Sequence, residues 1–299
     1  MHWSIDSIPN LNHKTILITG ANSGIGFEAA RVFAAKGARL ILACRNQQKG
    51  QAAINRILQE SPRAQLTLMS LDLSSLDSVK AFSAAVTEQF DHIDVLVNNA
   101  GVMAPPYSKT KDGFESQFGT NHLGHFALTA RLLPLLEKAE AGRVVVVSSV
   151  AHRLGHIRFK DLNWENRYSR WQAYGQSKLA NLMFAKELQR RLQARGSRVI
   201  AVAVHPGYSN TNLQQYMPVN RLLNSLFSQS QEKGALPTLC AATQPDLSGG
   251  EYIGPNGFLE MQGKPDLAYS TPRSNDKTIA RRLWDVSEKM TGESFLSVA

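Results

Sequence analysis

Residues 15–26 read Thr-Ile-Leu-Ile-Thr-Gly-Ala-Asn-Ser-Gly-Ile-Gly, and a helical stretch, Phe27 to Lys36, follows them directly. The first five residues are apolar or β-branched, which is typical of a buried parallel strand. The glycines at positions 20, 24 and 26 allow a tight turn, a close approach of the backbone to a pyrophosphate, and close packing of helix on strand. The stretch therefore predicts a dinucleotide-binding turn, with the anion on the amide groups at the helix N-terminus.

A second motif, Tyr174-Gly-Gln-Ser-Lys178, opens a segment with helical apolar spacing that runs to Arg191. Side chains four positions apart share one face of a helix. A buried lysine beside a tyrosine favours the phenolate, so we expect the pKa of Tyr174 to fall from its ordinary value of about 10. Such a tyrosine can donate a proton to a carbonyl. Taken alone, the pattern would more often be a surface lysine beside an amphipathic tyrosine; the glycine-rich turn gives it weight.

With both motifs present, the chain resembles the classical short-chain dehydrogenase/reductase family over roughly residues 14–252. Further signals follow in the family's order: Asp72-Leu73 after an apolar run, Asn98-Asn-Ala-Gly101 at a strand end, Asn121 in a helical segment beginning near Gly113, Ser149 ending the strand from Arg143, and Pro206-Gly207 after the Val199 to His205 strand. The resemblance implies a Rossmann-type doubly wound parallel sheet with helices on both faces. We expect an N-terminal extension, residues 1–13, and one domain over 14–299.

The resemblance also implies which side chains carry the chemistry. The catalytic set is Asn121, Ser149, Tyr174 and Lys178: Ser149 orients the substrate, Tyr174 is the acid, Lys178 holds the nicotinamide ribose, and Asn121 positions a water. The implied cofactor contacts are Gly20, Asn22, Ser23, Gly24, Ile25, Gly26, Arg45, Asn46, Asp72, Leu73, Asn99, Ala100, Gly101, Tyr174, Lys178, Pro206, Gly207 and Thr211.

The end of the expected second strand indicates which cofactor is used. An NAD enzyme holds a carboxylate for the ribose 2′-hydroxyl about 20 residues beyond the glycine turn, and that position here is Cys44. Without the carboxylate nothing repels a 2′-phosphate, which Arg45 and Asn46 can bind. We therefore expect NADP(H). If Arg45 merely faces solvent, the preference would be weak.

A closer resemblance is to the retinol dehydrogenase and WW-domain oxidoreductase branch, with its soluble bacterial relatives. The separation of Ser149 from Tyr174, 174 − 149 = 25 positions, is longer than in most classical members. The other shared motifs are Ala43-Cys-Arg-Asn46 with Lys49-Gly50, Asn121-His-Leu-Gly-His-Phe126, Ser148-Ser-Val-Ala-His152 and Ser177-Lys-Leu-Ala-Asn181.

Residues 208–230 follow the Pro206-Gly207 motif and predict an apolar substrate. Leu222, Leu223, Leu226 and Phe227 have the spacing of one helical face, which must be buried against something. We interpret the segment as a lid over an apolar aldehyde, ketone or alcohol. Permanent packing on the core or on another subunit remains open, as does a homo-oligomer.

Composition bounds the remaining possibilities. The net charge of +9 is scattered along the 299 residues, so no specific nucleic-acid binding is expected. The two cysteines are far apart and are expected to be buried, and the histidine pairs at 122/125 and 152/156 lack a third ligand nearby, so no metal is expected. Residues 1–13 lack the features of a signal peptide, and no 18-residue apolar run occurs, which predicts a cytoplasmic protein without a membrane span.

Two classes of function are compatible with these motifs. The first is an NADP(H)-dependent oxidoreductase acting on a carbonyl or alcohol. The second is a catalytically silent protein that binds NADP(H) as a sensor. A sensor usually lacks a catalytic group, and all four positions are filled here, which favours the enzyme.

Overall fold

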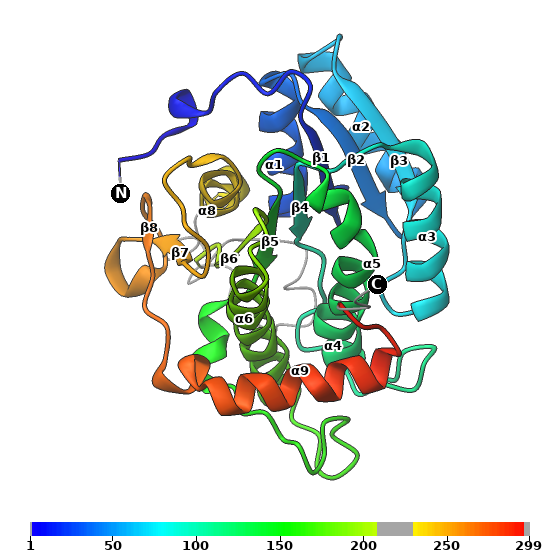
Figure 1. The fold of residues 1–299 in the computed structure, drawn as a ribbon, viewed down its shortest axis with the longest axis vertical. Helices are drawn as coiled ribbons and strands as arrows, with labels where there is room; N and C mark the ends of the chain where they lie inside the picture. The colour runs from blue at the N-terminus through cyan, green and yellow to red at the C-terminus, as the bar shows by residue number, and fades with distance from the viewer. Residues whose placement is uncertain (1, 208–229, 296–299) are drawn as a thin grey trace.

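The structure is a computed structural model, and it describes residues 2–207 and 230–295. Thr211 and all of the predicted lid except Ser230 lie outside the described residues. Figure 1 shows a central sheet with helices on both of its faces.

The sheet has eight strands in the order β3-β2-β1-β4-β5-β6-β7-β8. Neighbouring strands from β3 to β7 run parallel, and β8 pairs antiparallel with β7 at the edge. This is the doubly wound arrangement that the sequence predicts. In chain order the strands are β1 (Thr15–Thr19), β2 (Arg39–Cys44), β3 (Gln65–Ser70), β4 (Val95–Asn98), β5 (Arg143–Val147), β6 (Ile200–Val204), β7 (Tyr252–Pro255) and β8 (Pro265–Leu267).

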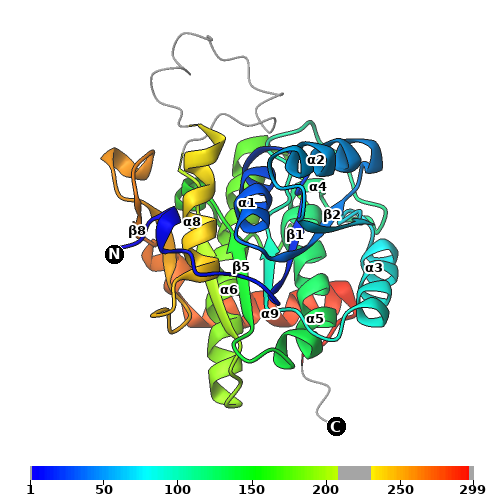
Figure 2. The same ribbon diagram turned by 90° about the horizontal axis from the view of Figure 1, so that it is seen from above.

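The helices cover the sheet in two layers, which Figure 2 shows from above. The α-helices are α1 (Gly24–Ala35), α2 (Gln47–Glu60), α3 (Leu76–Gln89), α4 (Ser116–Phe118), α5 (Gly124–Glu137), α6 (Arg170–Ala194), α8 (Gln231–Thr243) and α9 (Lys277–Thr291). The shorter helices are η1 (Ile5–Ser7), η2 (Gly119–Leu123), η3 (Val150–Leu154), η5 (Phe258–Glu260) and η6 (Pro272–Asn275).

Successive residues of each central strand enter different cores because side chains alternate between the faces of a sheet. In β1, Ile16 and Ile18 pack with α1, α2 and α8, whereas Leu17 packs with α3, α5, α6 and α9. All five residues of β1 are buried. Burial on both faces explains why the strand reads as a continuous apolar run rather than as an alternating one.

The order of the strands determines where a ligand can bind. The chain leaves β1 toward β2 on one side, while β4 pairs on the other side of β1. In a doubly wound sheet this reversal of strand order is the point at the carboxyl ends of the strands where ligands are expected to bind. The glycine turn after β1 and the Asn98–Gly101 turn after β4 both lie at this edge.

One predicted element differs in detail. The helical segment that contains Asn121 begins at Ser116 rather than near Gly113, and it is interrupted by η2, a π-helical turn in which the amide of Gly124 donates to the carbonyl of Gly119. Hydrophobic spacing reports a period of 3.6 residues, and it carries no signal for a single wider turn.

The N-terminal residues lie on the core beside α8. Trp3, Ile8 and Leu11 are buried in the same cluster as α1 and α8, and Trp3 Nε1 donates to Thr243 Oγ1 at 3.3 Å. No helix within residues 2–207 and 230–295 is long and apolar enough to cross a membrane.

Candidate active site

The turn after β1 depends on its glycines. Gly20 and Gly24 have φ values of +67° and +61°, a region that residues with a Cβ rarely adopt. A methyl group at Gly26 would lie 2.6 Å from the Gly20 carbonyl oxygen and 2.5 Å from Asn99 Nδ2. The backbone therefore folds tightly into the N-terminus of α1 at positions that require glycine, which is the kind of turn that a pyrophosphate site uses.

The Asn98–Gly101 turn is tied to the end of β1. The amides of Asn99 and Ala100 both donate to Thr19 Oγ1 at 2.9 Å, and Asn99 Nδ2 donates to the Thr19 carbonyl at 2.8 Å. Thr19 is absent from the predicted cofactor set. Its position in the sequence, directly before Gly20 at the end of the strand, could have indicated this role, because a hydroxyl there can form hydrogen bonds with the neighbouring turn.

Three of the predicted residues meet at Gly101. A methyl group there would lie 3.0 Å from Asn121 Oδ1 and 3.7 Å from Lys178 Nζ. The Asn121 side chain accepts from the amide of Val102 at 2.8 Å and donates to the Val102 carbonyl and to Ser177 Oγ, both at 3.0 Å. These bonds hold the segment after β4 against η2. The predicted role of Asn121 in positioning a water stays a prediction.

Tyr174 and Lys178 lie on α6, as their spacing predicts, and Ser149 follows β5. Burial raises the pKa of Tyr174 to about 12, and a hydrogen bond with Ser149 opposes that rise. Burial also lowers the pKa of Lys178 to about 8.

The expectation that Tyr174 has a lowered pKa is therefore wrong, because burial raises it. Lys178 Nζ donates to the carbonyl of Val147 at 3.1 Å and lies 5.7 Å from the centre of the Tyr174 ring. The ammonium is directed at a backbone oxygen rather than at the phenol, so burial dominates the tyrosine's pKa. Helical spacing places two side chains on one face without fixing where the end of a long lysine points.

His125 joins the two turns to the helix. Its Nδ1 lies 2.9 Å from the carbonyl oxygen of Asn121, which can only accept, so Nδ1 carries the proton. Its Nε2 lies 2.9 Å from Thr19 Oγ1. The carbonyl oxygen of Val97 lies farther from the same hydroxyl, at 3.3 Å. That hydroxyl oxygen already accepts hydrogen bonds from two amides of the Asn98–Gly101 turn. The Thr19 hydroxyl therefore donates its own hydrogen to Nε2 of the ring. His125 is thus a neutral bridge; the sequence offered only core, capping or substrate-lining roles for it.

Two buried histidines predict that the fold weakens in mild acid. Burial lowers the pKa of His122 to about 3 and that of His125 to about 4. Below about pH 6.5 the unfolded chain binds protons that the folded chain does not, so the free energy of unfolding falls as the pH falls toward 4. The expected loss is on the order of 1 kcal/mol per pH unit for each histidine. Urea unfolding at about pH 7.5 and 5.5 tests this, and equal free energies would contradict it.

The end of β2 presents a basic group and no acidic one. Arg45 is exposed and lines a cavity of about 420 Å³ together with Ser74, Gly101 and Lys109. Burial raises the pKa of the Cys44 thiol to about 11, while hydrogen bonds with the backbone of Ala21 and Asn22 oppose the rise. The thiol is therefore neutral and brings no charge that would repel a phosphate.

Other predicted cofactor residues lie around this edge with local structural tasks. Asn46 caps α2, since its Oδ1 accepts from the amide of Lys49 at 2.9 Å. Asp72 accepts from the amide and hydroxyl of Ser74; burial raises its pKa, but these bonds and the charges of Arg45 and Lys111 bring it below its ordinary value. The remaining predicted positions, Asn22, Ser23, Ile25 and Leu73 at the β1 and β3 ends and Pro206 and Gly207 after β6, border the same edge.

Of the histidines in the two predicted pairs, His122, His125 and His152 are buried and His156 is exposed. His122 Nε2 lies 2.9 Å from Ser287 Oγ, and His152 Nδ1 lies 2.8 Å from the carbonyl of Ser149. In the described part of the chain, no group of three or more His, Cys, Asp or Glu side chains could hold a metal ion. Cys44 and Cys240 are both buried.

The sequence profile of the short chain dehydrogenases matches residues 14–221. The chain belongs to the short-chain dehydrogenase family. Within it, the protein lies in the retinol dehydrogenase-like branch: it is 41% identical to mouse (Mus musculus) retinol dehydrogenase 14, over 95% of this chain and 88% of that protein. It is 42% identical to human (Homo sapiens) retinol dehydrogenase 11, over 96% of this chain and 88% of that protein.

Similar solved structures agree with the assignment of this chain to the short-chain dehydrogenase family. An uncharacterised protein of Mycobacterium paratuberculosis is 44% identical with a TM-score of 0.83, covering 99% of this chain and 100% of its own. A short chain dehydrogenase of Shigella flexneri in complex with NADP is 25% identical with a TM-score of 0.67, covering 82% of this chain and 98% of its own. The protein is an oxidoreductase of a family that uses nicotinamide cofactors, and the glycine turn, with positive φ at Gly20 and Gly24, fits such a cofactor.

Proposed function

We propose that this chain is an NADP(H)-dependent oxidoreductase that transfers a hydride between the nicotinamide and an apolar aldehyde, ketone or alcohol. The observation that carries the proposal is the convergence of Asn121 and Lys178 on Gly101, with Tyr174 hydrogen-bonded to Ser149 at the next strand end. These groups lie at the carboxyl edge of the sheet, where doubly wound folds bind ligands. We further propose that residues 14–299 act as one cofactor-binding domain.

In the proposed reduction, bound NADPH supplies the hydride. Ser149 and Tyr174 hold the carbonyl oxygen, and Tyr174 Oη gives it the proton that completes the alcohol. A pKa of about 12 keeps this phenol protonated at neutral pH, which suits a proton donor. Lys178 would hold the ribose hydroxyls and supply positive charge near the phenol. The residues proposed to hold the remainder of the cofactor are the glycine turn, Asn99 to Gly101 and Pro206-Gly207.

The substrate class is supported by the names of relatives and by composition. Retinol dehydrogenases are named for an apolar primary alcohol, and the two compared above are 41% and 42% identical to this chain. The apolar spacing of residues 222–227 agrees with such a substrate. The NADP(H) assignment is supported by Arg45 and the neutral Cys44, and by the complexes of related dehydrogenases with NADP and NADPH.

Turnover assays separate an enzyme from a sensor. Purified protein is mixed with NADPH or NADH and a panel of carbonyl compounds of graded polarity. Oxidation of the coenzyme is followed as the loss of the absorbance of the reduced nicotinamide. We expect NADPH oxidation with apolar aldehydes or ketones. Tight NADPH binding without turnover of any panel member would favour the sensor, and weak binding of both coenzymes would overturn the proposal.

Arg45→Ala should weaken NADPH far more than NADH. Only NADPH carries the 2′-phosphate, and a charge-assisted contact with it is worth about 1.5 to 3 kcal/mol, or roughly tenfold to a hundredfold in affinity. Dissociation constants measured for both coenzymes by nicotinamide fluorescence test the prediction. Arg39→Ala is the matched control, since Arg39 begins the same strand at its opposite end. Equal losses for the two coenzymes would place Arg45 outside the phosphate site.

A further inference from the structure

His205 lies at the end of β6, directly before the Pro206-Gly207 motif, and is fully buried. Its amide donates to the carbonyl of Ile253 at 2.9 Å, so the backbone is paired with β7. A methyl group at Gly254 would lie 1.9 Å from His205 Nε2, which means that the ring packs directly on the glycine backbone. The imidazole therefore has a fitted place between β6 and β7.

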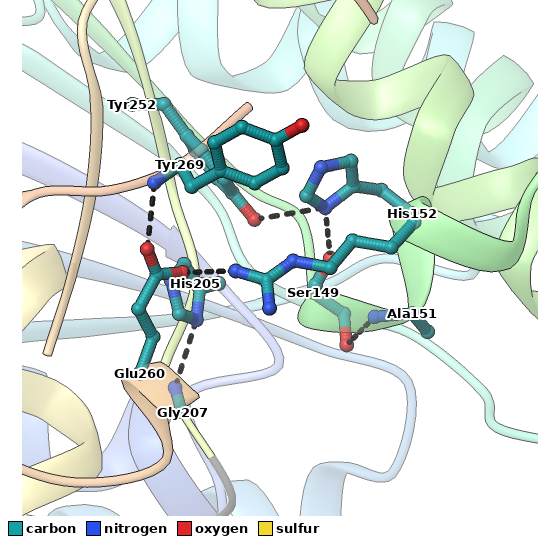
Figure 3. Close-up of polar contacts among 9 residues, drawn as sticks. Ser149, Ala151, His152, His205, Gly207, Tyr252, Glu260 and Tyr269 are labelled. Atoms are coloured by element: carbon teal, nitrogen blue, oxygen red, sulfur yellow. Dashed lines mark hydrogen bonds and ion pairs between the residues drawn. The ribbon is translucent and has the colours of Figure 1, made fainter. Parts of the chain in front are cut away.

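The ring is bonded to the turn that it precedes. The amide of Gly207 donates to His205 Nδ1 at 3.2 Å, as Figure 3 shows. An amide can only donate, so Nδ1 must hold a lone pair and the ring proton must be on Nε2. Gly207 has a φ of +68°, so this hydrogen bond closes a turn whose conformation favours glycine.

Glu260 favours the same tautomer. Its Oε2 lies 3.3 Å from His205 Nε2, and the carboxylate also accepts from Arg153 Nη2 and, at 2.7 Å, from the amide of Tyr269. The Nε2 proton is poorly aligned with this oxygen, so the contact is electrostatic rather than a well-formed hydrogen bond. A negative charge beside Nε2 stabilises a proton there and leaves Nδ1 free to accept.

The backbone around Glu260 is strained in a way that suits this task. Leu259 and Glu260 have φ values of +51° and +58°, although neither is glycine. Positive φ at such residues persists only where the surroundings enforce it, and it is concentrated at functional sites. Here the turn leaves Leu259 exposed and directs the Glu260 carboxylate inward to Arg153 and His205.

The contacts also reach the catalytic serine. Arg153 belongs to η3, which begins directly after Ser149, and the neighbouring His152 bonds the Ser149 carbonyl through Nδ1 at 2.8 Å. A continuous set of contacts thus runs from Ser149 through η3 and Glu260 to His205 and Gly207 (Figure 3).

We propose that His205 is a positioning residue: its Nδ1 holds the Gly207 amide and so fixes the Pro206-Gly207 turn against the nicotinamide, while Glu260 and Arg153 keep the ring in the required tautomer. The inference rests on the proposed function, because that function assigns the turn to the nicotinamide. It adds a residue that acts through Gly207 and touches no reacting atom.

The test compares two substitutions at one position. His205→Leu removes the acceptor, whereas an asparagine at 205 can accept the amide two residues later through its own side-chain oxygen. An unsatisfied buried amide should raise the dissociation constant of NADPH roughly tenfold in His205→Leu. In His205→Asn most of the affinity should return, which a role in filling space alone would not predict, because asparagine fills the ring's place poorly. Binding is measured by nicotinamide fluorescence without substrate.

Two further variants keep the outcome decisive. His156→Leu removes an exposed histidine and should leave NADPH binding unchanged. If His205→Leu does not fold, Glu260→Gln replaces the charge beside Nε2 by a neutral amide and should weaken NADPH binding about threefold. Equal affinities in His205→Leu and the wild type, or equal losses in the Leu and Asn variants, would overturn the role of His205 while leaving wild-type NADPH turnover intact. Failure of the wild type to bind NADPH would instead overturn the proposed function.

Discussion

Tyr174→Phe is expected to lower kcat for carbonyl reduction by about a hundredfold to ten-thousandfold, the range ordinarily contributed by a positioned proton donor. The substitution removes the hydroxyl and keeps the ring, so the packing of α6 should be preserved. The dissociation constant of NADPH should therefore change little. Single-turnover measurements, in which chemistry limits the rate, together with NADPH titration, separate the two effects.

The matched control for this substitution is Tyr107→Phe. Tyr107 is exposed and packs edge-on against Tyr168. Removal of its hydroxyl should leave kcat within about twofold of the wild type. A Tyr174→Phe enzyme that retained near-wild-type kcat in the single-turnover regime would show that another group donates the proton.

Lys178→Ala is expected to damage both turnover and coenzyme binding. Lys178 Nζ is buried beside Gly101, and its proposed tasks are to hold the nicotinamide ribose and to place positive charge near the phenol. We expect kcat to fall at least a hundredfold, as for loss of the acid, and NADPH affinity to fall roughly tenfold. Steady-state kinetics and NADPH titration measure the two losses. An unchanged NADPH affinity in this variant would show that Lys178 does not hold the ribose.

The pH dependence of binding gives an independent reading of the same lysine. Burial lowers the pKa of Lys178 to about 8, so its ammonium is charged below that pH and neutral above it. NADPH affinity should decline as the pH rises from about 7 to 9, and Lys178→Ala should remove that decline. Lys186→Ala is the control: it lies on the same helix, burial likewise lowers its pKa to about 8, and it bonds Ser270 and Asn275 outside the site.

The parts of the fold that the sequence predicts are those specified by local chemistry. The apolar residues 15–19 and the glycines after them predict β1, its turn and α1 because each depends on neighbours in the chain. Tyr174 and Lys178 share α6 for the same reason. The family resemblance predicted a doubly wound parallel sheet with helices on both faces, which the structure confirms.

The parts that escaped prediction depend on contacts between distant segments. The bridge from His125 to Thr19 joins residues 106 positions apart, and neither histidine spacing nor burial indicates it. Glu260 meets His205 only because β7 lies between β6 and the edge strand. The raised pKa of Tyr174 follows from its burial, while the Lys178 ammonium is directed at a backbone oxygen; both are properties of packing.

The π-helical turn at Gly119–Leu123 has a consequence for how this protein can change in evolution. An α-helix advances about 100° per residue, so one extra residue in a turn rotates everything beyond it by that angle. Before the turn, Gln117 faces the loop at Ala104; after it, Phe126 faces Trp284 of α9. The faces of α4 and α5 are therefore rotated relative to one another, and the rotation occurs in the turn that contains Asn121. The helices on the two sides of the turn can each keep their own pattern of apolar residues. Substitutions in α5 where it packs on α9 therefore need not change the direction in which residues before the turn face.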